Sequence, residues 1–506
     1  MAMLLSVLLH DLSGVLTGVS AQDDVMVHTL SADSRTVQAG ALFVARQGAR
    51  VDGLKLAPAA VANGAVAVLA GHGDALALRA ALGVPVIVVS DLAHVLGVLA
   101  DRFYGEPSRA LRVIGVTGTN GKTSISHFIA QALSFAGKQA GLIGTLGMGL
   151  WGDLQTATHT TPDVLSVHAE LARQRDQGAE YVVMEVSSHA LDQSRVAGVR
   201  FRAAVFSNLS HDHLDYHADM LHYAQAKRRL FVELQPEAAI INMDDAFGRE
   251  LLEALQHRTA LWAYGLGETP WAAREANVLD VRRMHLDGQG IKLTLHSPQG
   301  LAHLTSPLLG QFNACNLLAA LATLLELGMP LHAAIEALQH VQAPAGRMER
   351  FCANDKPLCV VDYAHTPDAL AQTLSTLRGH LKPKSEAKLW VVFGCGGNRD
   401  VSKRPRMGLV AAELADRVIV TDDNPRDEDG ESIVQGILAG MAQQDHVLVE
   451  RDRRCAIAFA LTEAAPDDIV LVAGKGHEDY QEIGGVRHAY SDRDTVRELL
   501  GEVSAC

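Results

Sequence analysis

The feature that most constrains this chain is a glycine-rich loop placed between an apolar run and an amphipathic segment. The apolar run covers residues 111–116, and the loop reads Gly115-Val116-Thr117-Gly118-Thr119-Asn120-Gly121-Lys122-Thr123. Glycines let backbone N–H groups turn toward a phosphate, and a helix that starts after the loop adds the positive end of its dipole. This order of strand, loop and helix predicts an α/β fold with a nucleoside triphosphate site.

The loop departs from the strict pattern G-x-x-x-x-G-K-[ST]. Val116 stands where that pattern has its first glycine, although Gly115 lies one position earlier and Gly118 lies inside the loop. We still interpret the segment as a phosphate loop, in which Lys122 meets the β- and γ-phosphate oxygens and the Thr123 hydroxyl binds Mg²⁺. The alternative is a glycine-rich turn with a surface lysine.

Chain length and breaks in the apolar pattern predict three domains. The 506 residues suit about three domains at roughly 100 to 200 residues each. Turn-forming residues interrupt the pattern at 104–108 and again at 341–346. We therefore expect an N-terminal domain over 1–107, a central phosphate-loop domain over 108–345 and a C-terminal domain over 346–506.

Apolar runs place the expected strands of these domains. Near-continuous apolar runs suit parallel strands that are buried on both faces. The runs lie at residues 65–69, 84–89, 111–116, 181–186, 203–206, 238–241, 359–362, 389–393, 417–421 and 469–472. A Leu/Ala-rich helix is expected to begin near Asn316. The predicted fold class is α/β, with a central parallel sheet covered by helices on both faces and a Rossmann-like C-terminal domain.

Composition excludes several classes of protein. Hydrophobic residues make up 48% and charged residues 20% of the chain, which is typical of a soluble globular protein. The formal net charge of −14 disfavours nucleic acid as a partner. Two short basic clusters, at residues 227–229 and 403–406, are interpreted as local anion sites or as solvated surface.

The chain shows no recognisable membrane or secretion signal. Residues 1–9 are apolar, but they lack a basic n-region and a small-residue cleavage site and are too short to span a bilayer. No other run approaches about 20 uninterrupted apolar residues. The six cysteines contain no C-x-x-C pair and are too sparse for a disulfide framework. We expect a cytoplasmic protein without membrane insertion.

Glu185 and His213 are candidate metal ligands of the central domain. Glu185 lies at the end of the apolar run 181–186, and a carboxylate at the C-terminal end of a strand beside the phosphate-loop strand suits Mg²⁺. The alternative is a carboxylate that caps a helix. By spacing alone, His213 is a ligand, a base or a loop histidine, with the last favoured, and Lys227 is a surface lysine.

Three polar loops of the C-terminal domain follow expected strands and are complementary to a zwitterion. They cover residues 394–400, 422–426 and 474–478. Arg399 and Arg426 can bind a carboxylate, whereas Asp423, Glu478 and the backbone carbonyl of Gly474 can hold an ammonium group. Ligands of open α/β sheets bind at the carboxyl ends of the strands, so these loops predict an amino-acid pocket. The alternative is charge that loops at strand ends carry by chance.

The segment T-G-T-N-G-K-[ST] resembles the phosphate loop of the Mur ligases and of their relatives, the folylpolyglutamate synthases. The resemblance implies an enzyme that uses ATP and Mg²⁺ to join an amine to a carboxylate, through an acyl phosphate and a tetrahedral intermediate. The segments M-E-V-S-S-H and N-L-S-x-D-H-L-D-Y-H are similar to the motifs in which this glutamate and histidine, Glu185 and His213, bind the second metal. Lys227 matches the lysine that is carbamylated near the metals in this family.

The resemblance implies three sets of binding residues, with Lys122, Lys227 and His213 as catalytic residues. The ATP contacts are Gly118, Thr119, Asn120, Gly121, Lys122, Thr123, Ser124, Asn313, Arg347 and Asp362, with Asn316 in the same segment as Asn313. The contacts to a uridine-nucleotide substrate with a muramoyl peptide are Ser34, Arg35, Thr160, Thr161, Ser187, Gln193 and Arg195. The contacts to the incoming amino acid are Arg399, Asp423, Asn424, Pro425, Arg426, Gly474 and Glu478.

Several of these residues have plainer interpretations when the resemblance is set aside. Asn313 and Asn316 would then serve as helix caps. The substrate contacts would be turn or surface residues, although Arg195 is chemically suited to an anionic substrate because a guanidinium pairs bidentately with carboxylate or phosphate. Arg347 and Asp362 are implied to contact ATP when the C-terminal domain closes, which would exclude water from the acyl phosphate.

The loop Asp423-Asn424-Pro425-Arg426 resembles the D-N-P-R motif of the Mur ligases that add meso-diaminopimelate. This implies addition of diaminopimelate to the D-glutamate of UDP-N-acetylmuramoyl-L-alanyl-D-glutamate, in cytoplasmic synthesis of peptidoglycan precursors. The expected partners are these two substrates and ATP, and we expect a monomer. One departure is Asn398, where the family commonly has aspartate before Arg399. Two rivals stay open: a ligase that adds lysine or glutamate, and a non-catalytic protein in which nucleotide closes the domains around a partner.

Overall fold

A computed structural model describes residues 2–12, 16–17, 24–48, 51–157, 159–214, 216–267, 276–381, 386–443 and 445–501. The chain divides into two compact units. The first unit comprises Met1–Lys122, Gly137–Ile241 and Asp245–Trp262, and the second comprises Thr123–Ala136, Asn242–Asp244 and Ala263–Cys506. The domain boundaries expected near residues 107 and 345 stay a prediction.

The N-terminal part of the first unit is a small α/β sheet. Its strands run in the order β2-β7-β6-β5-β4, and β4, β5, β6 and β7 pair in parallel. Their bounds are β2 (Leu16–Thr17), β4 (Thr29–Ser31), β5 (Ala41–Ala45), β6 (Ala65–Ala70) and β7 (Val86–Val89). The short strands β1 (Met3–Leu4) and β3 (Met26–Val27) form a separate pair. The accompanying helices are α1 (Leu5–Leu8), η1 (Gly53–Leu56), α2 (Ala57–Ala62), α3 (Ala75–Leu82) and α4 (Leu92–Phe103).

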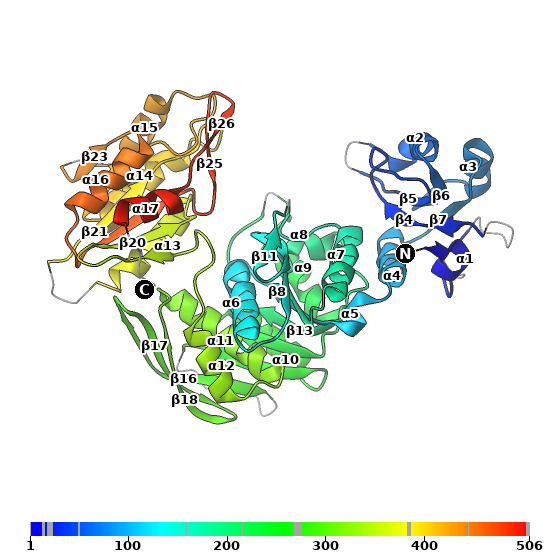
Figure 1. The fold of residues 1–506 in the computed structure, drawn as a ribbon, viewed down its shortest axis with the longest axis horizontal. Coiled ribbons are helices and arrows are strands. Elements are labelled where there is room, and N and C mark those ends of the chain that lie inside the picture. The colour runs from blue at the N-terminus through cyan, green and yellow to red at the C-terminus, as the bar shows by residue number, and fades with distance from the viewer. Residues whose placement is uncertain are drawn as a thin grey trace. The chain divides into compact units, whose positions relative to one another are not determined.

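A mainly parallel sheet carries the phosphate loop (Figure 1). Its strands in the first unit run in the order β11-β10-β9-β12-β8-β13-β14-β15. Neighbouring strands pair in parallel within the part β9-β12-β8-β13-β14. Their bounds are β8 (Arg112–Thr117), β9 (Ala140–Gly144), β10 (Gly147–Leu150), β11 (Asp153–Gln155), β12 (Tyr181–Glu185), β13 (Phe201–Phe206), β14 (Ala238–Asn242) and β15 (Ala260–Gly265). The helices of this part are α5 (Pro107–Ala110), α7 (Val164–Asp176), α8 (Ser188–Asp192), α9 (Met220–Val232) and α10 (Ala246–Leu255).

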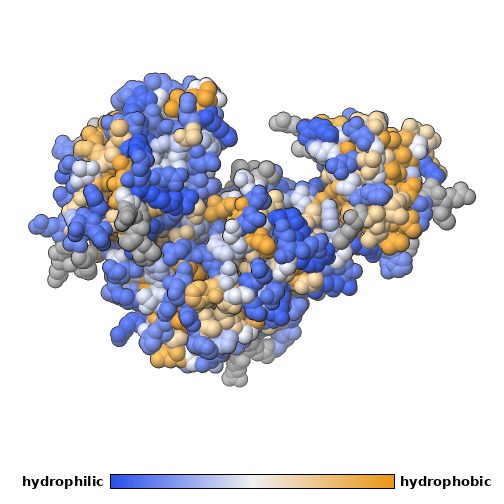
Figure 2. All heavy atoms as spheres, viewed as in Figure 1, coloured by the Kyte–Doolittle hydropathy of each residue, from blue (hydrophilic) through white to orange (hydrophobic). Residues whose placement is uncertain are grey.

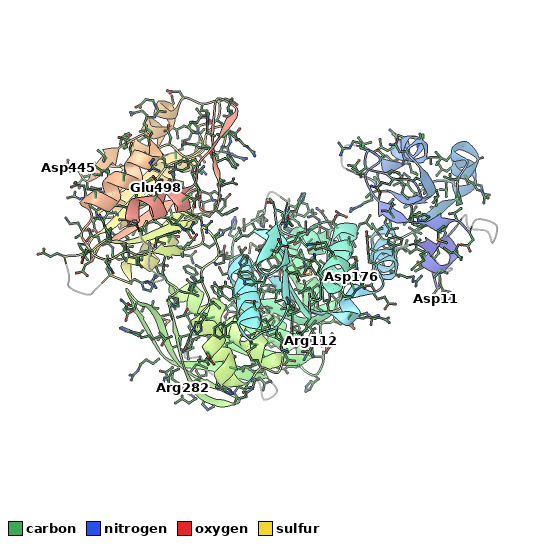
Figure 3. The ribbon with its side chains drawn as sticks, viewed as in Figure 1. Asp11, Arg112, Asp176, Arg282, Asp445 and Glu498 are labelled. Carbon is green, nitrogen blue, oxygen red and sulfur yellow. The ribbon has the colours of Figure 1, made fainter. Side chains whose placement is uncertain are left out.

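Strand β8 lies between β12 and β13, so its carboxyl end is flanked by theirs. Arg112 starts β8 at the opposite end, where its guanidinium donates to Tyr181 Oη at 2.7 Å (Figure 3). The phosphate loop, Glu185 and the residues after Phe206 therefore meet at one edge of the sheet. The apolar runs predicted to form these strands are confirmed.

The second unit contains an antiparallel set of strands that the apolar runs did not predict. These are β16 (Asn277–Asp287), β17 (Gly290–Ser297) and β18 (Gly300–Ser306). Two helices follow, α11 (Gln311–Glu326) and α12 (Leu331–Gln339), and α6 (Lys122–Phe135) also belongs to this unit apart from its first residue. The expected start of α11 near Asn316 is wrong, because the helix begins at Gln311 after Gly310.

The C-terminal part of the second unit is a six-stranded sheet in the order β19-β20-β24-β21-β22-β23. Its strands are β19 (Glu349–Phe351), β20 (Leu358–Asp362), β21 (Leu389–Phe393), β22 (Arg417–Val420), β23 (Val447–Val449) and β24 (Ile469–Ala473), and all but β19 are parallel. The helices are α13 (Pro367–Arg378), α14 (Lys403–Leu414), α15 (Gly430–Leu438), α16 (Arg453–Glu463) and α17 (Asp492–Leu500), and a hairpin pairs β25 (Tyr480–Ile483) with β26 (Val486–Ala489).

Both faces of this C-terminal sheet are buried, as the continuous apolar runs predict. Leu389, Val391 and Phe393 of β21 belong to one apolar core, whereas Trp390 and Val392 belong to another. Successive side chains of a strand point to opposite faces, so β21 is covered on both sides. The outer face of the C-terminal part is mostly hydrophilic where Figure 2 shows it. No helix among the described residues is long and apolar enough to cross a membrane.

Candidate active site

The phosphate loop is fastened to the segment that follows β13. Thr119 N donates to Asn208 O at 2.8 Å, and Asn120 N donates to Asn208 Oδ1 at 3.0 Å. Gly118 has a φ of +146°, and a Cβ at this position would collide with Ser207 Oγ. Only glycine therefore fits at this close approach of the two segments, and the loop is held in one shape before any ligand binds.

Lys122 and the residues after it begin helix α6, as the strand–loop–helix interpretation requires. Lys122 Nζ donates to Gly118 O at 2.9 Å and to Thr119 O at 2.8 Å, so the ammonium lies against the loop. Thr123 and Ser124 fall in the first helical turn and are partly buried. The first N–H groups of a helix have no partner within it, which suits them to an anion.

Glu185 is a buried carboxylate at the end of β12. The residue is 1% exposed, and its Oε1 and Oε2 accept hydrogen bonds from Thr145 N at 2.8 Å and Thr145 Oγ1 at 3.2 Å. The alternative that it caps a helix is wrong, because Ser187 is the N-cap of α8 and accepts from Ala190 N at 3.2 Å.

Five of the predicted substrate contacts form one hydrogen-bonded cluster around Glu185. Thr145 Oγ1 lies 3.0 Å from Thr160 Oγ1, and Thr161 Oγ1 donates to Glu185 O at 2.8 Å. Ser187 N donates to Thr161 Oγ1 at 3.2 Å. The structure therefore brings Thr160, Thr161 and Ser187 together from two loops that are separate in the sequence.

Arg195 completes this cluster. Its guanidinium donates to Thr161 O at 2.9 Å and to Gln193 Oε1 at 3.1 and 2.8 Å. Burial lowers the pKa of Arg195, and the neighbouring Arg46 lowers it further. A partly desolvated guanidinium that already lies beside a second arginine is suited to an anionic ligand. Tyr216, which sequence reasoning missed, accepts from Gln193 Nε2 at 3.1 Å.

Ser34 and Arg35 lie apart from this cluster in the hydrogen-bond pattern. Arg35 is exposed and pairs bidentately with Asp33 at 2.9 and 2.7 Å, which lowers the pKa of Asp33 to about 2. Ser34 is buried, and its backbone carbonyl accepts from Asn63 Nδ2 at 2.9 Å. Among the described residues, no hydrogen bond links Ser34 or Arg35 to Arg195.

Lys227 is buried beside the phosphate loop, so its interpretation as a surface lysine is wrong. The residue is 1% exposed on α9, its Nζ donates to Gly118 O at 2.8 Å, and the same atom lies 4.3 Å from the Tyr223 ring. Burial lowers its pKa well below the ordinary lysine value, and the nearby charge of Lys122 lowers it further. The neighbouring Arg228 is the exposed member of this basic cluster.

His213 lies in the loop between β13 and α9 and has a φ of +54°. Its Nε2 is 3.5 Å from Asp212 Oδ2, and its ring centroid is 4.9 Å from that of His189. Within the described ranges, no three His, Cys, Asp or Glu residues form a group that could hold a metal ion. Mg²⁺ is usually bound by one or two carboxylates together with substrate phosphates and water, so Glu185 and a hydroxyl such as that of Thr123 fit its chemistry.

The three polar loops of the C-terminal domain do converge. Gly397 N donates to Asn424 O at 2.9 Å, and Asn424 Nδ2 donates to Glu478 Oε2 at 2.9 Å. Arg426 has a φ of +54°, donates to Gly397 O at 2.8 Å, and has its Nε 3.6 Å from Glu482 Oε2. Arg399 is exposed. The loops therefore place two guanidinium groups and one carboxylate around the ends of β21, β22 and β24.

Asp423, which is expected to bind an ammonium group, lies at a buried position. It is 8% exposed, and burial raises its pKa while Arg453 and Lys475 oppose that rise. A Cβ at Gly474, where φ is +115°, would lie 2.6 Å from Asp423 Oδ2. The glycine therefore permits this close contact between two of the loops.

Of two further predicted ATP contacts in the second unit, Asp362 is buried and Arg347 is half-buried. Asp362 accepts from Met348 N and Ala364 N, each at 2.8 Å, and burial raises its pKa. The Arg347 guanidinium lies 4.9 Å from the Tyr363 ring centroid.

Asn313 and Asn316 are internal residues of α11 rather than its cap. Asn313 Nδ2 donates to Leu309 O at 2.9 Å, and Asn316 Nδ2 donates to Asn313 Oδ1 at 3.0 Å. The N-cap of this helix is Gly310, which makes no side-chain cap bond. The helix-cap interpretation of the two asparagines is therefore wrong.

The basic cluster at 403–406 is only partly a solvated surface. Arg404 is 4% exposed and donates to Glu428 Oε2 at 2.7 Å, while Glu428 Oε1 accepts from Asn398 N. Sequence reasoning missed both members of this pair. The only available signal was the position of Arg404 on the inner side of a helix that follows the 394–400 loop.

The fold and these sites define an α/β phosphate-loop protein with a second cluster of charged side chains at the strand ends of its C-terminal sheet. Three family descriptions match the chain: Mur ligase family, catalytic domain over residues 26–104, Mur ligase middle domain over 116–324, and Mur ligase, glutamate ligase domain over 346–476. The chain belongs to the Mur ligase family.

Relatives cover nearly the whole chain. A UDP-N-acetylmuramoyl-L-alanyl-D-glutamate--2,6-diaminopimelate ligase of Xanthomonas campestris is 50% identical and covers 97% of each chain. The protein of the same name from Pseudomonas aeruginosa is 48% identical, covering 95% of this chain and 96% of the relative. A solved structure of an enzyme with that name aligns with a TM-score of 0.73 at 39% identity over 94% of both chains. The predicted three-domain α/β fold class is confirmed by this similarity.

Proposed function

We propose that the protein is an ATP-dependent ligase that adds meso-2,6-diaminopimelate to the D-glutamate of UDP-N-acetylmuramoyl-L-alanyl-D-glutamate. The observation that carries this proposal is the pocket of the C-terminal domain. Asn424 and Arg426 of the D-N-P-R loop lie within hydrogen-bonding networks that include Glu478 and Gly397. A substrate with two carboxylates and two ammonium groups is complementary to such a set of charges.

The chemistry proceeds in two steps. The D-glutamyl carboxylate attacks the γ-phosphorus of ATP, and the bond between this phosphorus and the bridging β-phosphate oxygen breaks. ADP is the leaving group, and the substrate becomes an acyl phosphate. A neutral amine of the amino acid then attacks the acyl carbon. The attacking nitrogen loses one proton to solvent or a base, and the tetrahedral intermediate collapses to the amide and expels orthophosphate.

Residues of the phosphate loop neutralise the transferred phosphoryl group in this proposal. Gly118 to Gly121 direct backbone N–H groups to the phosphates, with Ser124 in the first turn of α6. Lys122 supplies a positive charge at the β- and γ-phosphate oxygens. Thr123 and Glu185 hold Mg²⁺, which supplies charge stabilisation when bound.

His213 and a carbamylated Lys227 would hold a second metal. The lowered pKa of Lys227 favours the neutral amine, which is the form that attacks CO₂. The carbamate would place an anion at the buried position that the side chain occupies beside Gly118 O. It would supply oxygen ligands where the unmodified side chain offers none.

The anionic uridine-nucleotide substrate binds along the first unit. We assign Thr160, Thr161, Ser187, Gln193 and Arg195 to its peptide part, on the basis of their hydrogen-bonded cluster. Ser34 and Arg35 are assigned to its uridine end. Because Arg35 is already paired with Asp33, the structure supports Arg35 less strongly than Arg195.

Asn313, Arg347 and Asp362 are assigned to ATP, and Arg399, Asp423, Asn424, Pro425, Arg426, Gly474 and Glu478 to diaminopimelate. Asp423 is the buried carboxylate of this set. We further propose a cytoplasmic monomer of peptidoglycan precursor synthesis, built from domains over 1–107, 108–345 and 346–506.

Phosphate release from ATP tests the proposal. With UDP-N-acetylmuramoyl-L-alanyl-D-glutamate present, meso-diaminopimelate should stimulate release and L-lysine should not. Release with lysine alone would leave a ligase but contradict the substrate assigned to Arg426. Absence of phosphate release with every candidate amine would contradict the ligase and favour a nucleotide-dependent binding protein.

A further inference from the structure

Lys475 is a buried cation that the proposed reaction does not yet use. Its side chain is 0% exposed in the loop after β24. Its Nζ donates to Asn424 Oδ1 at 3.0 Å and to Glu478 Oε2 at 3.2 Å, and it lies 5.6 Å from the Tyr480 ring centroid. One ammonium group thus joins the loop after β22 to the loop after β24.

Glu478 is fixed through one of its two oxygens. Oε2 accepts from both Lys475 Nζ and Asn424 Nδ2, whereas Oε1 accepts no hydrogen bond from the described residues. The Glu478 side chain is 20% exposed, so the carboxylate lies at the boundary between interior and solvent. It therefore has a set orientation and an oxygen that remains able to accept from a ligand.

Asn424 is held from the other side as well. Its Oδ1 accepts from Glu482 N at 2.9 Å in addition to Lys475 Nζ, and the residue is 2% exposed. With oxygen and nitrogen both engaged, its amide orientation is determined by the network. The three side chains Lys475, Asn424 and Glu478 form a closed triangle of hydrogen bonds.

Stability alone does not account for a lysine at this position. Removing an ammonium from water is costly, and an ion pair with one buried member is often no more stabilising than apolar side chains of similar volume. The hydrogen bonds of Lys475 therefore have a use in the orientation of its partners. The partner that reaches the surface is Glu478.

We propose that Lys475 is a positioning residue that fixes Glu478 to bind the second, non-reacting amino group of diaminopimelate. The proposal rests on the function proposed above. The attacking amine needs a free electron pair, so it must be neutral when it reacts. An amino group held by a carboxylate stays an ammonium, and Glu478 is therefore suited to the amino group that does not react.

Steady-state kinetics of Lys475→Met tests this role, with exposed Lys356→Met of the same domain as the matched control. The KM for diaminopimelate should rise about 10- to 100-fold, the effect of losing hydrogen bonds to a charged group. The KM for ATP and for the uridine-nucleotide substrate should stay within about twofold, since neither is assigned to the residues of this triangle. Lys356→Met should change none of them.

A substrate analogue separates positioning from general damage to the pocket. 2-Aminopimelate keeps both carboxylates and the reacting amine but lacks the second amino group. Lys475→Met should leave its KM, or its Kd where turnover is low, nearly unchanged. Equal increases for both amino acids, or an unchanged KM for diaminopimelate, would overturn the proposal.

Two further variants keep the test decisive. If Lys475→Met does not fold, Lys475→Gln keeps a hydrogen-bond donor and should raise the diaminopimelate KM without a large loss of thermal stability. In a Glu478→Gln background, Lys475→Met should add little, because its effect passes through Glu478. Additive losses would contradict this route.

Wild-type measurements distinguish failure of this inference from failure of the proposed function. Wild-type protein that releases phosphate with diaminopimelate, together with an unaffected Lys475→Met variant, would contradict only the role of Lys475. Wild-type protein without such release contradicts the ligase. Calorimetry would then compare the binding of diaminopimelate by wild-type and Lys475→Met protein. An absence of binding to the wild-type protein would contradict both the ligase and the role of Lys475.

Discussion

Two lysines are buried at the two sites, and their surroundings differ in charge. Lys227 lies against the carbonyl of Gly118, where burial and the neighbouring Lys122 both lower its pKa and Asp212 only partly opposes them. Lys475 instead donates to the carboxylate of Glu478 and the amide of Asn424. The same side chain thus meets two different surroundings, a carbonyl and a second lysine in the first unit and a carboxylate and an amide in the second.

The comparison teaches that burial alone does not decide what a lysine does. At Lys227, burial and a nearby cation both lower the pKa, whereas Lys475 lies beside a carboxylate that pairs with it. A neutral buried amine is a nucleophile toward CO₂, whereas a lysine paired with a carboxylate fixes the position of its partner.

The largest effect is expected for Lys227→Met. Loss of the proposed carbamate would remove a charged group from the proposed phosphoryl-transfer site, and kcat should fall about 100- to 1,000-fold. The fold should survive, because methionine fits a buried position without an unpaired charge. Steady-state phosphate release measures the loss, and exposed Arg228→Met serves as the control.

Chemical rescue sharpens this prediction. A small carboxylate such as acetate or formate should restore part of the activity of Lys227→Ala, because it can replace the anionic end of a carbamate. Full activity of wild-type protein whose mass and ¹³C spectrum show an unmodified Lys227 would contradict the assignment.

Arg426→Ala should have the next largest effect. The KM for diaminopimelate should rise about 100-fold, because a charge-assisted contact to a carboxylate is lost. The KM for ATP should change little. Arg454→Ala is the control, because among the described residues the hydrogen bonds of Arg454 go to the exposed Glu498 on α17, labelled in Figure 3. Similar increases for both substrates would show that Arg426 acts on the fold.

A smaller change is expected for Arg404→Met. Arg404 supports the loop of Asn398 through Glu428, at some distance from the ligand. The diaminopimelate KM should rise about tenfold, the cost of one charge-assisted hydrogen bond in a supporting position. Exposed Arg406→Met should be neutral. An unchanged diaminopimelate KM in both variants would mean that Arg404 contributes only to the stability of the fold.

The last prediction concerns the pH dependence of stability, through a buried histidine that stays neutral. Burial lowers the pKa of His127 on α6 from 6.5 to about 4. The unfolded chain therefore takes up a proton near pH 6.5 while the folded protein does not, so stability is lost as pH falls from 6.5 toward 4. His127→Leu should remove about 2 to 3 kcal/mol of this pH dependence of the free energy of unfolding.

Urea unfolding at pH 7 and pH 4.5 measures this difference. Exposed His332→Leu, on α12, provides the control for an ordinary surface histidine. If the free energy of unfolding changes equally between the two pH values in wild-type protein and in His127→Leu, the assignment of a neutral His127 is contradicted.

Local signals in the sequence predicted much of the fold. The apolar run 389–393 coincides with β21, and the glycine-rich loop lies between β8 and α6 as expected. Strands β16 to β18 were missed, because in β17 buried residues alternate with exposed or half-buried ones instead of forming a continuous run. The start of α11 was placed too late because a glycine with φ of +94° begins it rather than a polar cap.

The sites were less predictable because burial depends on partners distant in the sequence. Lys227 and Gly118 are separated by 109 positions, and Lys475 and Asn424 by 51. Nothing in the local pattern of either lysine indicates a buried side chain. The cluster around Arg195 was predicted only through the family motifs, since hydroxyl groups and amides carry no periodicity of their own.

The most direct test of the account is a competition between two amino acids for one activated substrate. Wild-type protein is incubated with ATP, UDP-N-acetylmuramoyl-L-alanyl-D-glutamate and equal concentrations of meso-diaminopimelate and L-lysine, and the products are identified by mass spectrometry. The account predicts a product heavier than the substrate by one diaminopimelate less one water. A lysine adduct as the main product, or no adduct while ATP is bound, would contradict it.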